Sequence, residues 1–394
     1  MSDLDLMRDA VDELAAMDRP SAGAGERRAA DWIAARLQEL GSSARVEEER
    51  ALGGYWWPIG IPNVAALLAA LALGRRPRSW RRRALALLTG VAGAAAVWDD
   101  TGGGRLWLRR PFQRGTTANV MAEVGDPEAP RTLVFVSHHD AAHSGLVFHP
   151  ALSELGPGYR HDKPGGPTQT FPIMFTVWLG PVLLALAALT GRRPVRRLAA
   201  AFGGGAALAM ADIGARATVP GANDNLSAVA VLLALARRLR DQPPQGVRVI
   251  LLSTGSEESF MEGMQGWVRR HRTRLDPART EVICLECVGS PYLQVIEGEG
   301  MLRMRDYDAD TREELMQAAR AVGVEPGRGL RTVAATDGLI TLRAGIPTAT
   351  LCSIDDKGFP SNYHWPSDRP ENLSWETIEQ ALETCWSLVG RRAA

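Results

Sequence analysis

The sequence lacks an excess of charge of either sign and has few cysteines. Over 394 residues, 45 Lys and Arg balance 45 Asp and Glu. A chain of zero net charge presents no electrostatic field that attracts nucleic acid, so we expect no nucleic-acid partner. Among the four cysteines is one C-x-x-C pair, Cys284 and Cys287, but a second pair is missing. We therefore interpret these two as buried structural thiols rather than zinc ligands.

The sequence also lacks a secretory signal at its beginning. Residues 1–19 are acidic and amphipathic and contain no apolar segment of the kind that forms the centre of a signal peptide. The length allows one large domain or two ordinary ones with a sizeable core. We expect a single domain over residues 1–394.

Apolar periodicity predicts helices and strands that alternate along the chain. The turn at residues 125–127 suggests that the strands on either side of it are neighbours in the sheet. Strands that alternate with helices are typical of an α/β fold with three layers (α/β/α), in which a mostly parallel mixed sheet is covered on both faces. We expect helices over 4–17, 27–40, 226–239 and 313–322 and after Ser374, and strands over 119–124, 133–136, 247–252 and 282–285.

Acidic residues and histidines stand where the predicted strands end. Ligand sites of α/β sheets form beyond the carboxyl ends of the strands, so we expect these side chains to converge. Imidazoles and carboxylates suit zinc or a similar divalent ion. Two histidines and three carboxylates can hold two ions if one carboxylate bridges, and one Glu then remains as a base. The residues are His138, Asp140, Asp224, Glu257, Glu258, Glu286 and His364.

The order of these residues resembles the M28 family of co-catalytic zinc aminopeptidases. The motifs are H-x-D at 138–140, G-x-x-D-N at 221–225, E-E at 257–258, an acid before x-V-G at 286–289, and Y-H-x-P-x-D at 363–368. Each motif alone is common, but the five in this order are a specific signal. The resemblance implies a zinc exopeptidase-like fold. It also implies a hydrolase with peptide substrates, namely a binuclear zinc aminopeptidase that releases N-terminal residues from short peptides.

The resemblance further implies a role for each residue. Glu257 would be the general base that takes a proton from the attacking water. Asp140 would orient His138, and Tyr363 could act as an oxyanion donor in substrate binding. Asp224 would bridge two Zn²⁺ ions. The ligands of the two ions would be His138, Asp224, Glu258, Glu286 and His364.

The sequence departs from the family pattern at two places. Glu286 stands where aminopeptidases of the family commonly carry Asp, and the longer side chain changes how one metal would be held. Residues 336–338 read Thr-Asp-Gly where the family often has S-D-H. We interpret Asp337 as a residue that orients its loop, and the missing His removes no metal ligand.

Some residues of the motifs also have a simpler structural interpretation. Asp224 precedes a predicted helix and could be its N-cap, although Asn225 or Ser227 could fill that position instead. His139 alternates with His138 along the strand and faces the other way. His143 and His149 are not expected to be ligands.

Two apolar stretches are not explained by the resemblance. Segments 56–98 and 171–210 each contain two apolar runs around a group of arginines, and we interpret both as helical hairpins inserted into the domain. Ten arginines lie at the two tips, and Trp56, Trp57, Trp80 and Trp98 flank the apolar runs, as membrane proteins place basic and aromatic residues. Only the run 171–190 reaches the roughly twenty residues of a spanning helix.

These hairpins predict association with the cell membrane, with basic tips in the cytoplasm and the catalytic domain outside it. The alternative is a soluble cap on a cytoplasmic protein. Three other functions also stay open. A carboxypeptidase-like amidohydrolase would use the same metals, and an acyltransferase of the glutaminyl-cyclase type would be expected to use one. A non-catalytic binding protein on this fold would lose ligands, and none is missing here.

Overall fold

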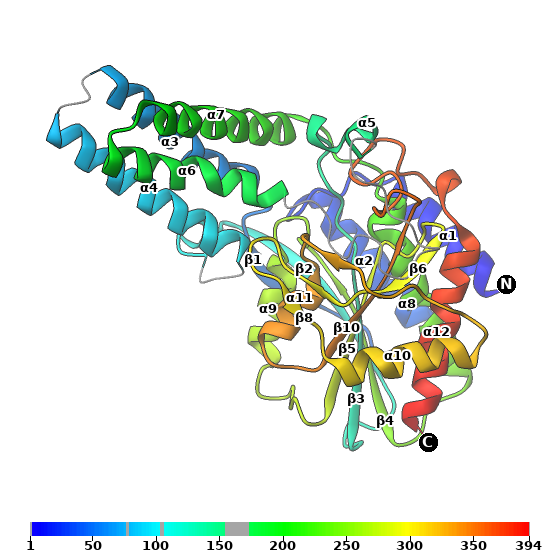
Figure 1. Ribbon diagram of the computed structural model, residues 1–394. Coiled ribbons are helices and arrows are strands. Elements are labelled where there is room, and N and C mark those ends of the chain that lie inside the picture. The colour runs from blue at the N-terminus through cyan, green and yellow to red at the C-terminus, as the bar shows by residue number, and fades with distance from the viewer. Residues whose placement is uncertain (1, 76–78, 103–105, 154–172, 394) are drawn as a thin grey trace.

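A mixed sheet forms the centre of the molecule (Figure 1). The computed structural model describes residues 2–75, 79–102, 106–153 and 173–393. The seven strands follow the order β1-β2-β4-β3-β5-β10-β6, in which β4, β3, β5 and β10 are parallel and the outer strands are antiparallel. Their bounds are β1 Arg45–Ala51, β2 Gly115–Val124, β3 Arg131–His138, β4 Val247–Thr254, β5 Thr280–Glu286, β6 Tyr292–Val295 and β10 Thr348–Ile354.

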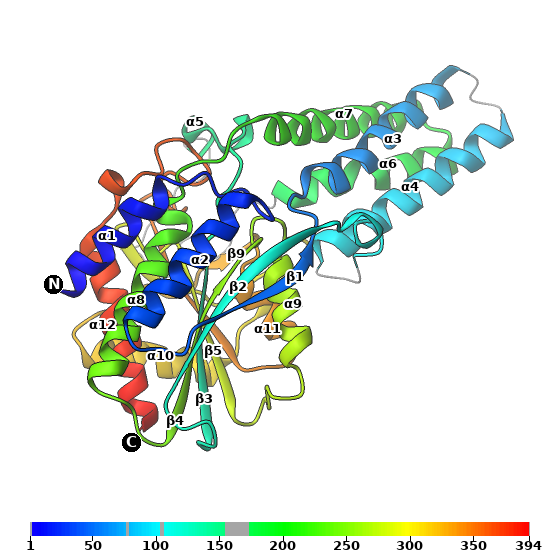
Figure 2. The same ribbon diagram turned by 180° about the vertical axis from the view of Figure 1, so that it is seen from behind.

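Helices cover both faces of this sheet, which confirms the predicted three-layer α/β fold (Figure 2). One face carries α1 Asp3–Ala15, α2 Ala24–Glu39, α8 Ser227–Asp241, α10 Ala309–Ala321 and α12 Trp375–Ala393, and the other carries α9 Glu262–His271 and α11 Asp337–Arg343. Strand β3 shows why both faces are apolar. Leu133 and Phe135 pack into the first core, and Val134 and Val136 pack into the second.

The expected pairing of the strands on either side of residues 125–127 was wrong. Strand β4 lies between β2 and β3 and forms hydrogen bonds with both. The prediction failed because it relied on a short turn, whereas the partner of a strand is decided by burial. The continuous apolar run of β4 is best buried in the middle of the sheet.

The remaining short elements lie at the edges of the body. A small sheet, ordered β8-β7-β9, stands beside the carboxyl ends of the central strands. Its strands are β7 Gly298–Glu299, β8 Arg305–Asp306 and β9 Arg331–Thr332. The short helices are η1 Arg110–Phe112, η2 Leu146–Phe148, α5 Pro150–Ser153, η3 Ala222–Leu226 and η4 Pro370–Asn372.

Two helical hairpins form an arm that projects from the body (Figures 1 and 2). The first hairpin consists of α3 Trp56–Arg75 and α4 Trp80–Thr101, and the second of α6 Ile173–Thr190 and α7 Arg193–Ala215. The four helices pack side by side. We use "arm" for these four helices, "base" for the end near the sheet and "tip" for the free end. Residues 76–78 and 171–172 of the predicted hairpins lie outside the described residues.

The expectation that only the run 171–190 reaches the length of a spanning helix was wrong. Helices α3, α4 and α7 are longer than the apolar runs from which they were predicted, whereas α6 is not. Helix α7 begins at Arg193, and α3 continues through Pro62. Two helices, over Trp56–Gly74 and Arg193–Ala215, are long and apolar enough to cross a membrane, and the apolar helix Met174–Thr190 is shorter. The difference arises because helices extend into flanking arginines and small residues that an apolar count leaves out.

Candidate metal centre

The predicted histidines and acids meet at the carboxyl edge of the parallel strands. His138 is the last residue of β3, Glu286 is the last residue of β5, and residues 257–258 follow β4. Asp224 lies in the turn before α8, and His364 lies in the loop after β10. Parallel strands bring their carboxyl ends to one edge, so residues far apart in the sequence become neighbours.

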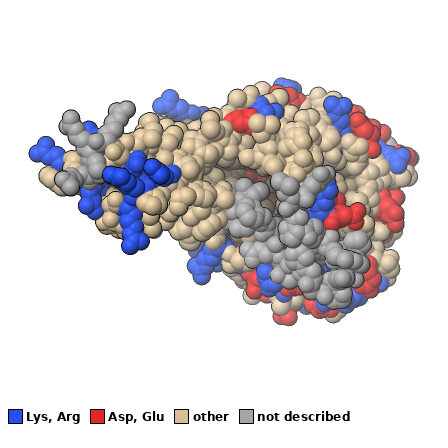
Figure 3. All heavy atoms as spheres, turned by 45° about the horizontal axis from the view of Figure 1, so that its top comes forward, with Lys and Arg blue, Asp and Glu red and all other residues tan. Residues whose placement is uncertain are grey.

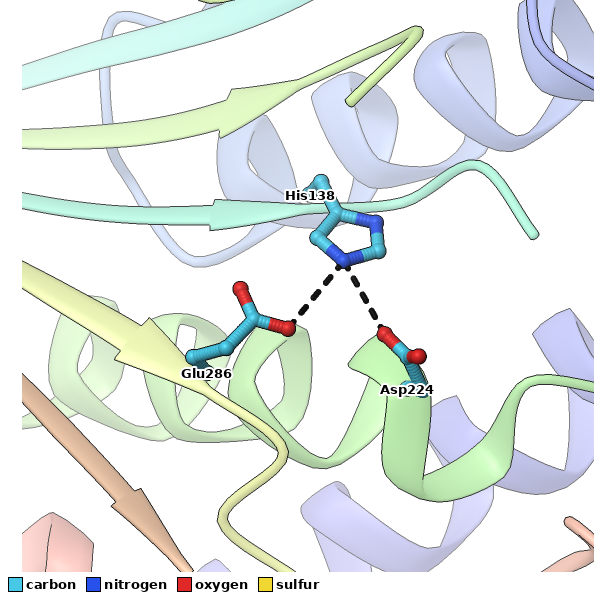
Figure 4. Close-up of side chains that lie close together, drawn as sticks. All are labelled: His138, Asp224 and Glu286. Atoms are coloured by element: carbon cyan, nitrogen blue, oxygen red, sulfur yellow. Dashed lines mark ion pairs between the residues drawn. The ribbon is translucent and has the colours of Figure 1, made fainter. Parts of the chain in front are cut away.

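Three side chains form the first group, shown in Figure 4. The Nε2 atom of His138 lies 3.2 Å from Oδ1 of Asp224 and 3.5 Å from Oε1 of Glu286. The imidazole points between the two carboxylates, and His138 and Asp224 are buried. This arrangement offers one nitrogen and two oxygen ligands to a single cation.

A second group of three shares Asp224 with the first. The Nε2 atom of His364 lies 3.2 Å from the other carboxylate oxygen of Asp224, Oδ2, and 3.3 Å from Oε1 of Glu258. One oxygen of Asp224 therefore faces each histidine. A carboxylate placed this way can bridge two cations.

Glu257 lies at the border of the two groups. Its Oε2 atom is 3.9 Å from Nε2 of His138, and the ligand atoms of His138, Glu257 and Glu258 also lie within 4.8 Å of one another. Neither of the first two groups includes Glu257. The carboxylate of Glu257 therefore reaches the space between the two groups. Asp224, Glu258 and Glu286 remain available as ligands of cations.

Asp140 holds the backbone of the two glutamates as well as facing His138. Its carboxylate accepts hydrogen bonds from the amides of Glu257 (3.0 Å) and Glu258 (3.1 Å) and from the hydroxyl of Ser21 (2.6 Å). Its Oδ1 atom is 3.4 Å from Nδ1 of His138. Asp140 thus connects the end of β3 to the turn after β4. The prediction had assigned it only the orientation of the His138 imidazole.

Asp368 supports Asp224 in the same way. Its two carboxylate oxygens accept hydrogen bonds from the amides of Asn223 (2.7 Å) and Asp224 (3.1 Å). Gly221, at φ +62°, begins this turn, and a Cβ there would lie 2.6 Å from the carbonyl oxygen of Asp224. The glycine is therefore required for the turn that presents Asp224.

Glu26 also supports the site, and no motif in the sequence indicated it. Its buried carboxylate accepts hydrogen bonds from the amide and hydroxyl of Ser256, at 2.9 and 2.8 Å, and from Thr117. Ser256 has a left-handed backbone (φ +51°), as do Cys287 (φ +49°) and His364 (φ +51°). Such conformations cost of order 1–3 kcal/mol each and persist where the surroundings enforce them.

The arm is attached to the turn that carries the two glutamates. The buried Arg109 donates hydrogen bonds to both carboxylate oxygens of Asp100 in α4, at 2.7 and 2.6 Å. It also donates to the carbonyl oxygen of Ser259 at 2.6 Å, and it lies 3.5 Å from Glu262. The base of the arm is thereby fixed next to the site.

Burial and crowding shift the pKa values of the clustered groups. Burial raises the pKa of Glu257, Glu258 and Glu286, and the neighbouring carboxylates add to this. Burial also disfavours the ionised form of Asp224, but contacts with both histidines outweigh it and lower its pKa. For His364, burial opposes protonation, yet Glu258 and Asp224 raise its pKa to about 10. Negative charge is therefore concentrated where cations would relieve it.

Several buried polar atoms at the site have no hydrogen-bond partner among the described residues. They include Nε2 of His138 and Oε1 of Glu258, both of which point into the groups described above. Buried polar atoms are normally satisfied, so unpaired atoms that converge on one space indicate a missing ligand. Nitrogen and carboxylate donors fit a divalent metal such as zinc.

Asp224 is not the N-cap of α8. Helix α8 has no side-chain N-cap, and Asp224 is directed to the histidines instead. Neither predicted substitute caps the helix. Asn225 donates a hydrogen bond to the carbonyl oxygen of Leu285, and Ser227 donates one to the carbonyl oxygen of Asn223.

The histidines that were not expected to be ligands do lie elsewhere. His139 is buried and bonds to Ser253 through Nδ1, and burial lowers its pKa to about 3. Nδ1 of His143 lies 2.6 Å from the carbonyl oxygen of Arg216, and Nδ1 of His149 accepts a hydrogen bond from the amide of residue 151. Asp337 accepts a hydrogen bond from Thr254 beside the site.

A cavity of about 200 Å³ opens beside the clustered acids. Tyr363 lines it and stacks on His364, with ring centroids 3.8 Å apart. The remaining wall is mostly apolar. It includes Ile296, Met301, Val333, Ile354 and Phe359, with Tyr55 and Met174 at the base of the arm. Cys284, Cys287, Cys352 and Cys385 are free and buried, as predicted for the first two, and Cys287 donates a hydrogen bond to Glu286.

Residues 207–389 match the family model described as Peptidase family M28. This match agrees with the resemblance and includes four of the five motifs, and the H-x-D motif at 138–140 lies outside the matched range. No curated protein matches the chain in sequence.

Solved structures that resemble this chain cover almost all of it. A Zn-dependent exopeptidase from Parabacteroides distasonis is 15% identical with a TM-score of 0.56, over 98% of this chain and 97% of that one. A glutaminyl cyclase from Bacteroides thetaiotaomicron is 14% identical with a TM-score of 0.57, over 98% and 97%. A leucine aminopeptidase precursor from the same organism is 15% identical with a TM-score of 0.54, over 98% and 96%. At such identities these similarities establish the fold and no more.

Proposed function

Because residues 207–389 match peptidase family M28, we propose that this protein is a binuclear zinc exopeptidase, and specifically an aminopeptidase. The observation that carries the proposal is the position of Asp224, whose two carboxylate oxygens each face a different histidine at 3.2 Å. One zinc would be held by His138, Asp224 and Glu286, and the other by Asp224, Glu258 and His364.

In the proposed reaction, water attacks the carbonyl carbon of the first peptide bond. Bound zinc would supply Lewis acidity and lower the pKa of the attacking water. Glu257 accepts the proton of that water at its carboxylate and later delivers it to the leaving amine nitrogen. Asp140 keeps Glu257 in place through the amide hydrogen bond.

The cavity determines which substrate fits this reaction. The metals and the acidic groups around them would together hold the free N-terminal amine. Its apolar wall would accept an apolar first side chain. Tyr55 and Met174 bring the base of the arm to the rim, which narrows access and favours short peptides over folded proteins.

An acyltransferase of the glutaminyl-cyclase type, which we expect to use one metal, is the second candidate, because a glutaminyl cyclase has this fold. The presence of two ligand groups favours the exopeptidase. The group of His138, Asp224 and Glu286 lies beside that of Asp224, Glu258 and His364, and a reaction with one metal would need only one of them. A carboxypeptidase-like amidohydrolase would share both metals and differ in what it accepts.

The test combines metal analysis with a panel of substrates. We expect about two zinc ions per chain, loss of activity on chelation and its return with zinc or cobalt. Leucine and methionine p-nitroanilides should be cleaved, and their N-acetyl forms should not. Full activity with one metal per chain would contradict the binuclear site. Equal cleavage of the blocked compounds would exclude an aminopeptidase, and cyclisation of N-terminal glutamine without hydrolysis would favour the acyltransferase.

We further propose that the arm is embedded in the cell membrane. Most of the large apolar side chains exposed on this protein lie on its four helices, for example Leu68 (59% exposed) and Leu88 (68% exposed). In the buried cluster nearer the tip of the arm, the side chains are mostly alanines, with Leu73 and Leu184 as the larger residues. Large apolar residues outside and small ones inside are the arrangement expected when lipid surrounds a bundle.

Close packing of small residues supports the same proposal. A Cβ on Gly90 of α4 would lie 2.6 Å from the amide nitrogen of Ala185 in α6, and one on Gly203 would lie 3.0 Å from the carbonyl oxygen of Asn63. Helices of 18 to 23 residues rise roughly 27–34 Å, which matches a hydrocarbon core of about 30 Å. The arginines at the tip would then be cytoplasmic and the catalytic body outside.

A further inference from the structure

A second cavity lies at the tip of the arm, far from the metal centre. It measures about 200 Å³ and is lined by Arg83, Arg192, Arg193, Arg196 and Arg197. Figure 3 shows basic side chains gathered at this free end, while the sides of the arm carry almost none. We refer to these five arginines and the cavity between them as the tip pocket.

Two arginines of the tip pocket are held in place by backbone groups. Arg83 of α4 donates hydrogen bonds to the carbonyl oxygens of Ala188 (2.9 Å) and Leu189 (2.7 Å) at the end of α6. Arg196 of α7 donates to the carbonyl oxygen of Ala70 in α3 at 3.4 Å. Its Nη1 atom lies 2.2 Å from the position that a Cβ on Gly74 would take, so the guanidinium packs directly against the backbone of α3. All four helices therefore build the pocket.

No acid balances the charge of the tip pocket. The sequence has no Asp or Glu at residues 56–98 or 173–211. Within the described part of the chain, none of the five arginines forms an ion pair. Helix α7 also begins at Arg193, and the positive end of its dipole adds to the field. Five guanidinium groups around one cavity form a site for an anion with several oxygens, and arginine binds phosphate through paired hydrogen bonds.

We propose that the tip pocket binds the phosphate group of an anionic phospholipid. The proposal rests on the membrane-embedded arm, which would place the pocket at the headgroups of the cytoplasmic leaflet. Leu85, Leu189 and Leu198 are exposed on the helices just below the arginines, so acyl chains could lie along them. Basic pockets between membrane helices on this side are suited to anionic headgroups. The same arginines would also bind free phosphate, and the experiment distinguishes free phosphate from the phospholipid.

The test measures lipid binding by full-length protein in a neutral detergent. The probe is a fluorescent phosphatidylglycerol, with phosphatidylcholine of the same acyl length for comparison and inorganic phosphate as competitor. The pocket variant is Arg193→Gln with Arg196→Gln. The matched control is Arg81→Gln with Arg82→Gln, which removes two charges from the same tip without altering a lining residue.

We expect phosphatidylglycerol to bind more tightly than phosphatidylcholine. Loss of two charge-assisted contacts should weaken this binding about tenfold or more in the pocket variant. The control should change it less than about threefold. Equal losses in both variants would show diffuse attraction and overturn the pocket. Binding of inorganic phosphate with no preference for phosphatidylglycerol would also overturn it, in favour of a soluble phosphate ligand.

Failure of the tip-pocket proposal can be distinguished from failure of the proposed peptidase activity and of the proposed membrane association. Both variants should retain peptidase activity in detergent and should fractionate with membranes like the unchanged protein. A pocket variant that loses lipid preference while keeping both properties supports the tip pocket alone. If the unchanged protein is found in the soluble fraction, the membrane proposal fails whatever the lipid assay shows.

Discussion

Glu257 and Glu258 are adjacent in the sequence but face different partners. Glu258 lies 3.3 Å from His364 in the second ligand group, whereas the nearest histidine to Glu257 is 3.9 Å away. Asp140 holds the amides of both. A difference of one position along the chain therefore separates a proposed metal ligand from a proposed base.

Replacing these two glutamates should give different defects. Glu257→Gln should retain both metals and lower turnover roughly 10²–10⁴-fold, because the amide cannot accept the proton of water. Glu258→Gln should instead reduce bound metal. Metal content by mass spectrometry and kcat on leucine p-nitroanilide measure the two effects. A Glu257→Gln enzyme with nearly full turnover would refute the assigned base.

Arg19 is a second residue whose role became visible only in the structure. It is fully buried, and burial lowers its pKa to about 10. Its guanidinium donates to the carbonyl oxygens of His139 (2.9 Å), Met17 (3.1 Å) and Pro220 (2.7 Å), and also to that of Leu14. It thus joins the segment after α1 to β3 and to the turn of Asp224.

Arg19→Met should lower the free energy of unfolding by about 3–5 kcal/mol, because it leaves buried carbonyl groups without donors. Denaturant unfolding followed by tryptophan fluorescence measures the change. Arg19→Lys is the control. It keeps the charge but cannot make the four bonds, so it should recover only part of the loss. Full recovery would mean that charge alone matters.

At the scale of elements, Glu47 joins β1 to α9. Its carboxylate lies 2.7 Å from Nε2 of His271 and 2.9 Å from Nε of Arg45. Burial opposes its ionisation, but these two contacts outweigh it and lower its pKa from 4.5 to about 2. The ionised form therefore stabilises the folded state. That contribution is present above pH 4.5 and is lost as the pH falls towards 2.

Glu47→Gln should be less stable than the unchanged protein by about 1–3 kcal/mol at pH 6, given roughly 1.4 kcal/mol for each pKa unit. The difference should shrink as the pH falls from 4.5 towards 2. Thermal unfolding across this range tests it. Glu48→Gln is the control, because its exposed pair with Arg27 is worth about 0–1 kcal/mol. A difference that does not vary with pH would refute the linkage.

The whole molecule combines a polar body with an apolar arm. Met174 of the arm and Tyr55, which directly precedes α3, line the cavity, and Arg109 fixes the arm beside the turn that carries the two glutamates. If the arm is embedded in lipid, the cavity opens close to the membrane surface. Peptides near that surface would then have the shortest path to the metals.

The protein should fractionate with membranes and require detergent, and removal of residues 57–97 should release part of it. A sharper test places Arg on the outer face of the arm. Leu68→Arg with Leu88→Arg should shift protein from membranes to the soluble or aggregated fraction, because each charge costs about 2.5–3.5 kcal/mol within a bilayer. Val322→Arg, at the exposed residue that directly follows α10, is the control. Monodisperse full-length protein without detergent would support a soluble cap.

The sequence alone predicted four central strands, the main helices and the identity of the clustered residues, but not strands β1, β6 and β10 or helices α9 and α11. Local periodicity is enough to place β4 and α8, and a strand end is enough to predict that His138 and Glu286 face one site. The order of the motifs indicated the family. These features depend on residues that lie close together in the chain or on a pattern that recurs across a family.

Only the tertiary structure decided which strands pair and what supports the site. Strand β4 separates β2 from β3 because its apolar run is best buried centrally. Glu26 reaches Ser256 across 230 positions, and Arg19 reaches Pro220 across 201. The tip pocket needs two hairpins packed together. Such contacts join residues from distant segments, and they depend on burial and packing of the whole chain, which no local pattern records.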